Sequence, residues 1–326
     1  MDYLLVTLRS IVCSPVVVRY PCKVLGRTLY DEDELNNLLE TSFYLLTYRM
    51  NFEPLPCSTL TSDRGWGCLA RASQMLLAHV LRRHAASECH LKFFCDMNDE
   101  HLAPFSLHCM TRAVIKHGTE FRADYWAPSQ GCEAIRSCVE SAVRQGLLTQ
   151  KLSVVVSSSG TIPEREIHEH LRGDGSVLVL VPVRCGTSRR MTQTMFFALE
   201  HLLHIPSCMG VVGGVPNRGY YIVGTSGHRL LYLDPHCMTQ NAMVSCELGK
   251  VGIVTPTTNL LRSVRWDHVD TSFFFGFLLD SLDEYEKLRE SLGEPSRMSI
   301  DPMLWVDSGD TPASRDSELM EWPNGL

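Results

Sequence analysis

The hydrophobic pattern of the chain is helical in the first third and strand-like in the last third. Residues 31–48 begin with acids and carry leucines at helical spacing, and residues 68–83 repeat apolar side chains every three to four positions. Residues 176–183 and 273–279 are continuously apolar and short enough to be buried strands. Because helices come first and strands follow, we expect an α+β fold rather than a parallel α/β fold.

The end of the chain differs in composition from the rest. Residues 220–233 hold two apolar runs joined by a turn and predict a β-hairpin, and residues 281–292 predict a helix that opens with acids. Prolines and acids then replace the apolar periodicity. We therefore expect a folded domain over residues 1–292 and a disordered, flexible tail over residues 293–326.

The 326 residues include 30 basic and 37 acidic side chains, which leaves a formal charge of −7. This acid excess gives no electrostatic basis for binding nucleic acid, which requires basic patches. Asp2 and Arg9 interrupt the apolar N-terminus, so we expect no signal peptide. No apolar run approaches the roughly 18 residues of a membrane span.

Thirteen cysteines are present, an odd number that cannot all pair within one chain. No two of them have the Cys-x-x-Cys spacing of zinc knuckles and thioredoxins. We interpret most of them as buried thiols in a reducing compartment, which favours a cytoplasmic location. The question is then whether one of them is a nucleophile.

The segment SDRGWGC, residues 62–68, stands directly before the second helical pattern. Its glycines permit a tight turn, and a cysteine at a helix N-terminus lies against the positive end of the helix dipole, which favours the thiolate. Cys68 is therefore a candidate nucleophile. A buried cysteine that only packs the start of the helix is an equally compatible interpretation.

A second group, Asp234-Pro235-His236, follows a predicted strand. Histidine is the natural partner of a cysteine nucleophile, and a carboxylate can orient it. In an extended segment, residues two apart face the same side, so Asp234 can reach one imidazole nitrogen and leave the other for Cys68. An ordinary turn after the strand explains the same residues.

Other catalytic signatures are absent from the sequence, which contains no G-x-S-x-G, no H-E-x-x-H and no P-loop motif. Cys13 and Cys138 each precede an arginine by six positions, as in cysteine phosphatases. Neither intervening run has the small residues that wrap a phosphate, so we interpret both cysteines as structural.

Five short motifs occur in order along the chain. They are YRMNF (48–52), SDRGWGCLARASQM (62–75), WAP (126–128), GGVPN (213–217) and YLDPH (232–236). Together they resemble the motifs of the autophagins, the papain-like cysteine proteases of autophagy, over most of the chain. The resemblance implies a papain-like fold over residues 1–292, with an auxiliary helical and β insertion at roughly residues 100–160.

The resemblance also assigns catalytic roles. Cys68 matches the nucleophile, His236 the base and Asp234 the carboxylate that orients the base. Tyr48 matches a tyrosine that helps to stabilise the oxyanion. No metal or organic cofactor is implied.

A gate over the active site is implied as well. Trp126 and Pro216 match the pair that covers the substrate groove. Gly213, Gly214 and Asn217 flank Pro216, and the glycine pair is expected to serve as the hinge of its loop.

The implied function is that of a cysteine endopeptidase acting on a ubiquitin-like autophagy modifier. It would cleave after a glycine near the modifier's C-terminus and release the modifier from phosphatidylethanolamine, with transient membrane-surface contact through the lipidated substrate. Two alternatives stay open: a deubiquitinase-type protease for another modifier, and a catalytically poor modifier-binding protein. The segment after His236 is one residue longer than in the family, which keeps the second alternative open.

Overall fold

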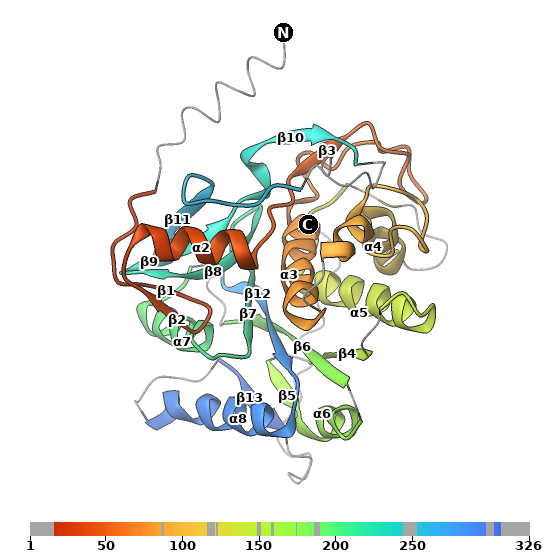
Figure 1. The fold of residues 1–326 in the computed structure, drawn as a ribbon. Coiled ribbons are helices and arrows are strands. Elements are labelled where there is room, and N and C mark those ends of the chain that lie inside the picture. Colours follow the sequence, from red (N-terminus) through yellow and green to blue (C-terminus); the bar gives the residue numbers. More distant parts are fainter. Residues whose placement is uncertain are drawn as a thin grey trace.

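The computed structural model describes residues 16–85, 88–115, 121, 123–148, 151–157, 160–173, 175–185, 190–243, 253–297 and 303–307. Within these ranges a mixed sheet of nine strands forms the centre of the molecule (Figure 1). Its strands from edge to edge are β11 (Leu261–Arg265), β9 (Arg229–Leu233), β8 (Arg218–Ser226), β7 (Cys208–Val215), β12 (Ser272–Leu279), β6 (Gly175–Arg184) and β4 (Lys151–Val156), while β1 (Cys22–Val24) pairs with β8 and β2 (Arg27–Leu29). The β4–β6 pair is parallel, and the other pairs are antiparallel.

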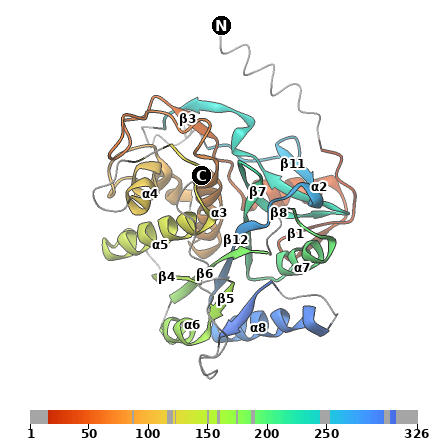
Figure 2. The same cartoon turned by 180° about the vertical axis from the view of Figure 1, so that it is seen from behind.

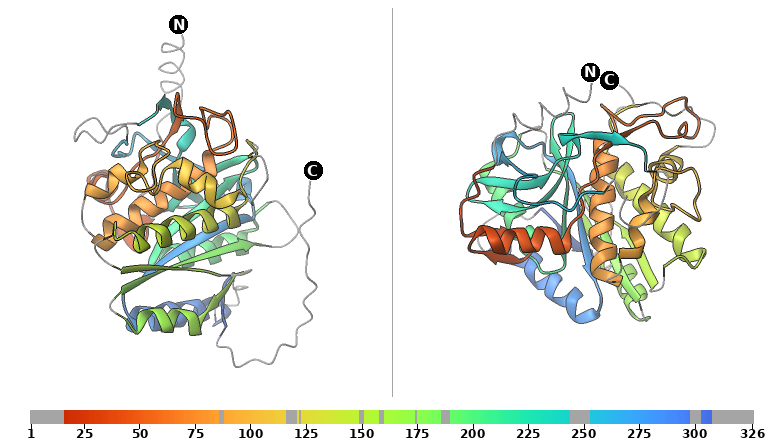
Figure 3. Two further views of the ribbon diagram at one scale, coloured as in Figure 1. Left: turned by 90° about the vertical axis from the view of Figure 1, so that its right-hand side faces the viewer. Right: turned by 45° about the horizontal axis from the view of Figure 1, so that its top comes forward.

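Helices cover both faces of this sheet, as the side view in Figure 3 shows. On one face lie α2 (Glu32–Ser42), α3 (Cys68–Ala85), α4 (Leu107–Val114) and α5 (Pro128–Arg144). On the other face lie α6 (Glu164–Leu171), α7 (Gln193–Leu203) and α8 (Leu282–Arg297), which are also seen from behind in Figure 2. The expected α+β class is confirmed.

Strand β12 explains why the predicted strands are continuously apolar. Phe274 and Leu278 point into the core shared with α3, whereas Phe273, Phe275 and Phe277 point into the core on the opposite face. Successive side chains of a strand alternate between its faces, so a strand covered on both sides needs apolar residues at every position.

The first helix is shorter than expected. Asp31 caps α2 by accepting a hydrogen bond from the Glu34 N–H at 2.9 Å, but the helix ends at Ser42 instead of residue 48. Residues 43–46 are all buried, and Leu45 forms a β-bridge to Val254. Four consecutive buried side chains would cover every side of a helix, so an extended segment fits them better.

Short elements complete the described chain: β3 (Tyr48–Met50) pairs with β10 (Thr239–Asn241), β5 (Thr161–Pro163) pairs with β13 (Trp305–Asp307), and η1 (Glu88–Phe94), η2 (Pro235–Cys237) and η3 (Trp266–His268) are 3₁₀ helices. Residues 100–160, the expected insertion, supply α4, α5 and the edge strand β4. No helix in the described ranges is long and apolar enough to cross a membrane.

The predicted tail is partly structured. Helix α8 continues past residue 293 to Arg297, and β13 adds a strand beside β5. The reason is apolar burial, because Met303 and Leu304 are 6% and 2% exposed and belong to the core that contains α8. The rest of the predicted tail, residues 308–326, lies outside the described residues.

Candidate active site

Cys68 is the first residue of α3 and is buried. Gly65 before it has a left-handed φ of 92°, and Gly67 has no room for a side chain because a Cβ there would overlap Asp63. The backbone N–H of Gly219, at the start of β8, donates to the Cys68 Sγ at 3.3 Å. The sulfur therefore lies at the positive end of a helix and beside a backbone donor.

His236 lies in η2, two residues after Asp234. Oδ1 of Asp234 accepts hydrogen bonds from the backbone N–H of His236 at 2.9 Å and from its Nδ1 at 2.6 Å. Burial disfavours a charged imidazole, but hydrogen bonds to Asp234 and Cys68, together with their negative charges, outweigh burial and raise the pKa of His236 to about 9. The imidazole is thus hydrogen-bonded to the carboxylate, is influenced by the charge of Cys68, and keeps its proton at neutral pH.

Tyr48 is brought to this pair by strand pairing. It begins β3 and lies opposite Thr239 of β10, the strand that follows His236. The ring centroids of Tyr48 and His236 are 5.1 Å apart in an edge-to-face arrangement. Burial, the charge of Cys68 and a hydrogen bond with Cys68 raise the pKa of Tyr48, so its hydroxyl remains a donor.

Trp126 lies just before α5 and packs near Trp66, with ring centroids 6.5 Å apart. Its indole N–H is buried and has no hydrogen-bond partner within the described ranges. The neighbouring Tyr125 is 40% exposed, and burial followed by the charge of Cys68 raises the pKa of its phenol. Tyr125 is therefore close to the candidate nucleophile, although only its position beside the WAP motif hinted at this.

Pro216 and Asn217 form the exposed turn between β7 and β8, and Asn217 adopts a left-handed φ of 63°. Gly213 and Gly214 lie inside β7, where a Cβ would overlap Phe273 of β12 at the first position and Arg218 of β8 at the second. Close packing requires glycine at both positions, and the hinge expected from the sequence stays a prediction.

A further tyrosine, Tyr220, lies against His236 and stacks on Tyr232, and the sequence predicts a role for neither. The Tyr220 ring is 5.7 Å from the His236 ring, and it stacks on Tyr232 at 4.1 Å. Both belong to the β8–β9 hairpin that leads into Asp234. The positions of these two rings depend on the register of the β8–β9 hairpin, which a single short sequence motif does not reveal.

A buried network of two arginines and two aspartates lies beside the nucleophile. Arg49, Asp63, Arg71 and Asp96 are each exposed by 2% or less. Arg71, one turn into α3, donates to Asp63 at 2.5 Å and to Asp96 at 2.8 Å. Burial opposes its charge, but the two carboxylates outweigh burial and raise the pKa of Arg71. The four formal charges cancel, as buried charges require.

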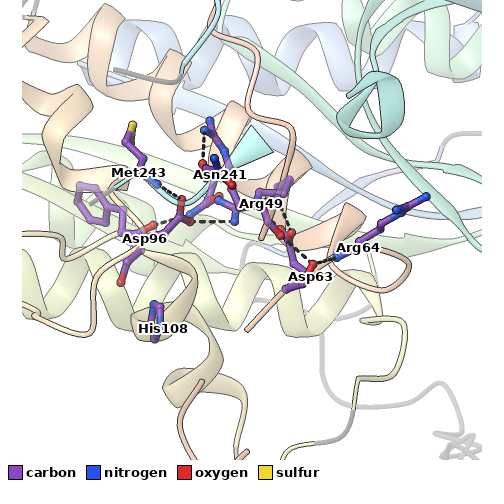
Figure 4. Close-up of polar contacts among 12 residues, drawn as sticks. Arg49, Asp63, Arg64, Asp96, His108, Asn241 and Met243 are labelled. Atoms are coloured by element: carbon purple, nitrogen blue, oxygen red, sulfur yellow. Dashed lines mark hydrogen bonds and ion pairs between the residues drawn. The ribbon is translucent and has the colours of Figure 1, made fainter. Parts of the chain in front are cut away.

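This network joins the segments that carry the candidate catalytic residues (Figure 4). Asp63 accepts a hydrogen bond from the backbone N–H of Arg49 at 2.6 Å and so holds β3 next to Tyr48. Asp96 accepts from the N–H of Met243 at 3.0 Å and so holds the segment after β10. Because Arg71 shares α3 with Cys68, one side chain connects the thiol, the tyrosine and the histidine segments.

Comparison with known proteins gives the family. A model described as "Peptidase C54 catalytic domain" matches residues 34–291, which include every candidate site residue. The chain belongs to the peptidase C54 family. The α+β fold of this C54 chain is accordingly the papain-like fold expected from the sequence.

Curated relatives agree with this assignment. The C54 chain is 28% identical over 279 residues to "Probable cysteine protease atg4" of Aspergillus oryzae, a match that covers 81% of the chain and 66% of the relative. It is 27% identical to the protein of the same name from Aspergillus clavatus, covering 83% and 76%. It is 25% identical to "Cysteine protease ATG4D" of Xenopus laevis, covering 76% and 65%. The chain is thus a member of a cysteine protease family.

One cluster in this C54 chain offers possible metal ligands. Glu164 and His168 of α6 and Glu286 of α8 place ligand atoms within 4.8 Å of one another. Glu286 is already paired with Arg289 at 2.7 Å. The cluster includes none of the candidate catalytic residues.

Proposed function

We propose that this C54 peptidase hydrolyses the amide bond after a glycine near the C-terminus of a ubiquitin-like autophagy modifier. The leaving amine is a peptide in the modifier precursor and phosphatidylethanolamine in the lipid-conjugated form. The family membership supports the protease class, and the five sequence motifs support the choice of substrate. Contact with the membrane surface is transient and made through the lipidated substrate, and no nucleic acid takes part.

The observation that carries the proposal is the 2.6 Å hydrogen bond between Asp234 Oδ1 and His236 Nδ1, next to Cys68, whose charge helps to raise the pKa of His236. With a pKa of about 9, His236 is protonated at neutral pH and stabilises a thiolate on Cys68. This thiolate–imidazolium pair is the reactive form of a cysteine protease.

Acylation is the first half of the reaction. The Cys68 thiolate attacks the glycine carbonyl carbon, and the electrons of the C=O bond move to the oxygen. The Tyr48 hydroxyl and the Cys68 backbone N–H, at the start of α3, donate to this oxyanion, and each such donor contributes about 3 kcal/mol. His236 then gives its proton to the leaving nitrogen, the C–N bond breaks, and a thioester on Cys68 remains.

Deacylation reverses these proton movements. His236, now neutral, accepts a proton from water as the water oxygen attacks the thioester. The C–S bond breaks, the modifier leaves with a C-terminal glycine carboxylate, and Asp234 keeps Nε2 of the imidazole directed at the reacting atoms through its bond to Nδ1.

Glycine specificity is attributed to aromatic side chains near Cys68. We assign Trp126, together with Tyr125 and the Pro216 turn, to the walls of the substrate groove. A substrate residue with a side chain would meet these walls, whereas glycine would not.

The test is side-by-side cleavage of two fusion proteins, one of the autophagy modifier and one of ubiquitin. The proposal predicts cleavage of the first only, and loss of all cleavage in Cys68→Ala. Preferential cleavage of the ubiquitin fusion would favour the deubiquitinase-type alternative. Binding of the modifier without turnover would favour the catalytically poor binder.

Delipidation is tested separately with modifier conjugated to phosphatidylethanolamine in vesicles. The expected result is release of free modifier into the supernatant by the wild type and none by Cys68→Ala. Processing of the precursor without release from vesicles would restrict the function to precursor cleavage. Location in the cytoplasm is part of the proposal, and it is supported by the lack of any disulfide among the described cysteines.

A further inference from the structure

A cavity of about 570 Å³ opens where β8 ends, β9 begins and β11 ends. Figure 1 draws these strands in its left half. Four chain segments line it: Val17 and Arg19 before β1, Gln193 at the start of α7, Ser226, His228 and Arg229 of the β8–β9 hairpin, and Arg265 and Trp266 between β11 and η3. None of these residues belongs to the candidate active site. The first two also precede the part of the chain matched by the family model.

Positive charge is concentrated in this cavity even though the chain as a whole carries −7. None of the eight lining residues is acidic. Arg265 is paired with Asp267 at 2.8 Å, whereas Arg229 donates to the neutral hydroxyl and carbonyl oxygens of Ser263 at 2.7 and 3.1 Å. The Arg19 guanidinium forms no ion pair with any described residue. Within the described ranges, no acidic side chain therefore compensates these two guanidinium charges.

The walls of the cavity are held by defined contacts. The backbone N–H of Arg19 donates to Oγ of Ser226 at 2.8 Å, and that hydroxyl donates to the Arg19 carbonyl at 2.9 Å. Trp266 stacks on Phe196 of α7, with ring centroids 6.2 Å apart. The N-terminal end of α7, capped by Thr192, adds the positive end of a helix dipole. The arginines are thus presented by a fixed frame.

We infer that this cavity binds a phosphate group. Guanidinium groups bind phosphate oxygens through paired N–H donors. Arginines from three separate segments offer enough donors for the several oxygens of a phosphate, whereas a carboxylate has only two oxygens. Trp266 supplies an apolar wall for the group that carries the phosphate. The phosphate comes from a soluble ester or from a phospholipid headgroup, and Val17, 84% exposed at the rim, is compatible with both.

Binding of inorganic phosphate to the full chain tests this inference directly, because the readout is independent of proteolysis. At an ionic strength held constant with sodium chloride, the wild type binds phosphate with a measurable Kd. The Arg19→Gln/Arg229→Gln variant, which changes two exposed side chains, raises that Kd at least tenfold. The matched control Arg165→Gln/Arg289→Gln, which removes the same charge from α6 and α8, leaves it unchanged.

Sedimentation with vesicles distinguishes the two sources of phosphate. Binding to phosphatidylcholine vesicles that contain phosphatidic acid, and not to phosphatidylcholine alone, identifies a headgroup if the double variant loses it. Binding of inorganic phosphate without vesicle binding identifies a soluble ligand. The inference is overturned if the double variant binds phosphate as well as the wild type, if the control loses binding equally, or if polyglutamate binds the cavity and phosphate does not.

Discussion

The ring of His236 is held between a carboxylate and a thiol, and its ionisation sets the pH range of the proposed chemistry. As the pH rises through about 9, His236 loses the proton that it gives to the leaving amine. We therefore expect kcat to fall on the alkaline side with a midpoint near pH 9, as measured by cleavage of a modifier fusion. A midpoint near 6.5, the ordinary value for histidine, would contradict the pairing.

Asp234→Asn tests the cause of that shift. Removing the charge and the hydrogen bond to Nδ1 removes two of the effects that raise the pKa of His236, so the alkaline midpoint moves to lower pH. Turnover falls by about 10⁴-fold, since the imidazole loses its orienting partner, while modifier binding is retained. Asp283→Asn, at an exposed position of α8, is the matched control and leaves both quantities unchanged.

Tyr48→Phe isolates the oxyanion donor from the packing of the ring. Loss of one such donor lowers kcat/KM by about 10²- to 10³-fold. The ring that packs against His236 is retained and only the hydroxyl beside Cys68 is lost, so the rate of Cys68 alkylation by iodoacetamide changes far less than kcat/KM. Tyr220→Phe, which keeps the other ring beside His236, serves as the comparison and retains most activity. Equal losses in both variants would remove the oxyanion role from Tyr48.

At the scale of the elements, the sequence patterns predicted types better than ends. The acids and leucines of α2 are present, but the helix stops before a run of buried residues that places Tyr48 in a strand. The partners of Arg71 could not be predicted at all, because Asp63 and Asp96 lie 8 and 25 positions away and follow no periodicity. Local motifs carry the chemistry of each side chain, while the contacts between motifs depend on tertiary packing.

Arg71→Met tests the network that connects α3, β3 and the segment after β10. It leaves the Asp63 and Asp96 carboxylates buried without their cation, which costs about 3–5 kcal/mol in the free energy of unfolding. Adding Asp63→Asn and Asp96→Asn removes the stranded charges and recovers part of that free energy in urea denaturation. The exposed ion pair of Arg165 and Glu169 on α6 gives the control, because Arg165→Met changes the free energy of unfolding by less than about 1 kcal/mol.

For the molecule as a whole, the hydrophobic core on the α8 side of the sheet reaches as far along the chain as the residues just before β13. Met303 and Leu304 pack into the same core as α8. Truncation after Arg297 removes them together with β13, and it lowers the free energy of unfolding by about 3–6 kcal/mol, at roughly 1.5–3 kcal/mol for each buried side chain. Truncation after Asp307 removes only residues predicted to be disordered, so stability and cleavage stay at wild-type values.

The pairing of Cys68 with His236 is tested most directly by labelling the chain with a thiol-reactive peptide that ends in glycine, followed by mass spectrometry. A poised thiolate reacts faster than a buried or ordinary thiol. The account predicts that Cys68 is the one labelled cysteine among the 13, and that His236→Ala abolishes the label. Labelling of another cysteine, or equal labelling of Cys68 in His236→Ala, would contradict it.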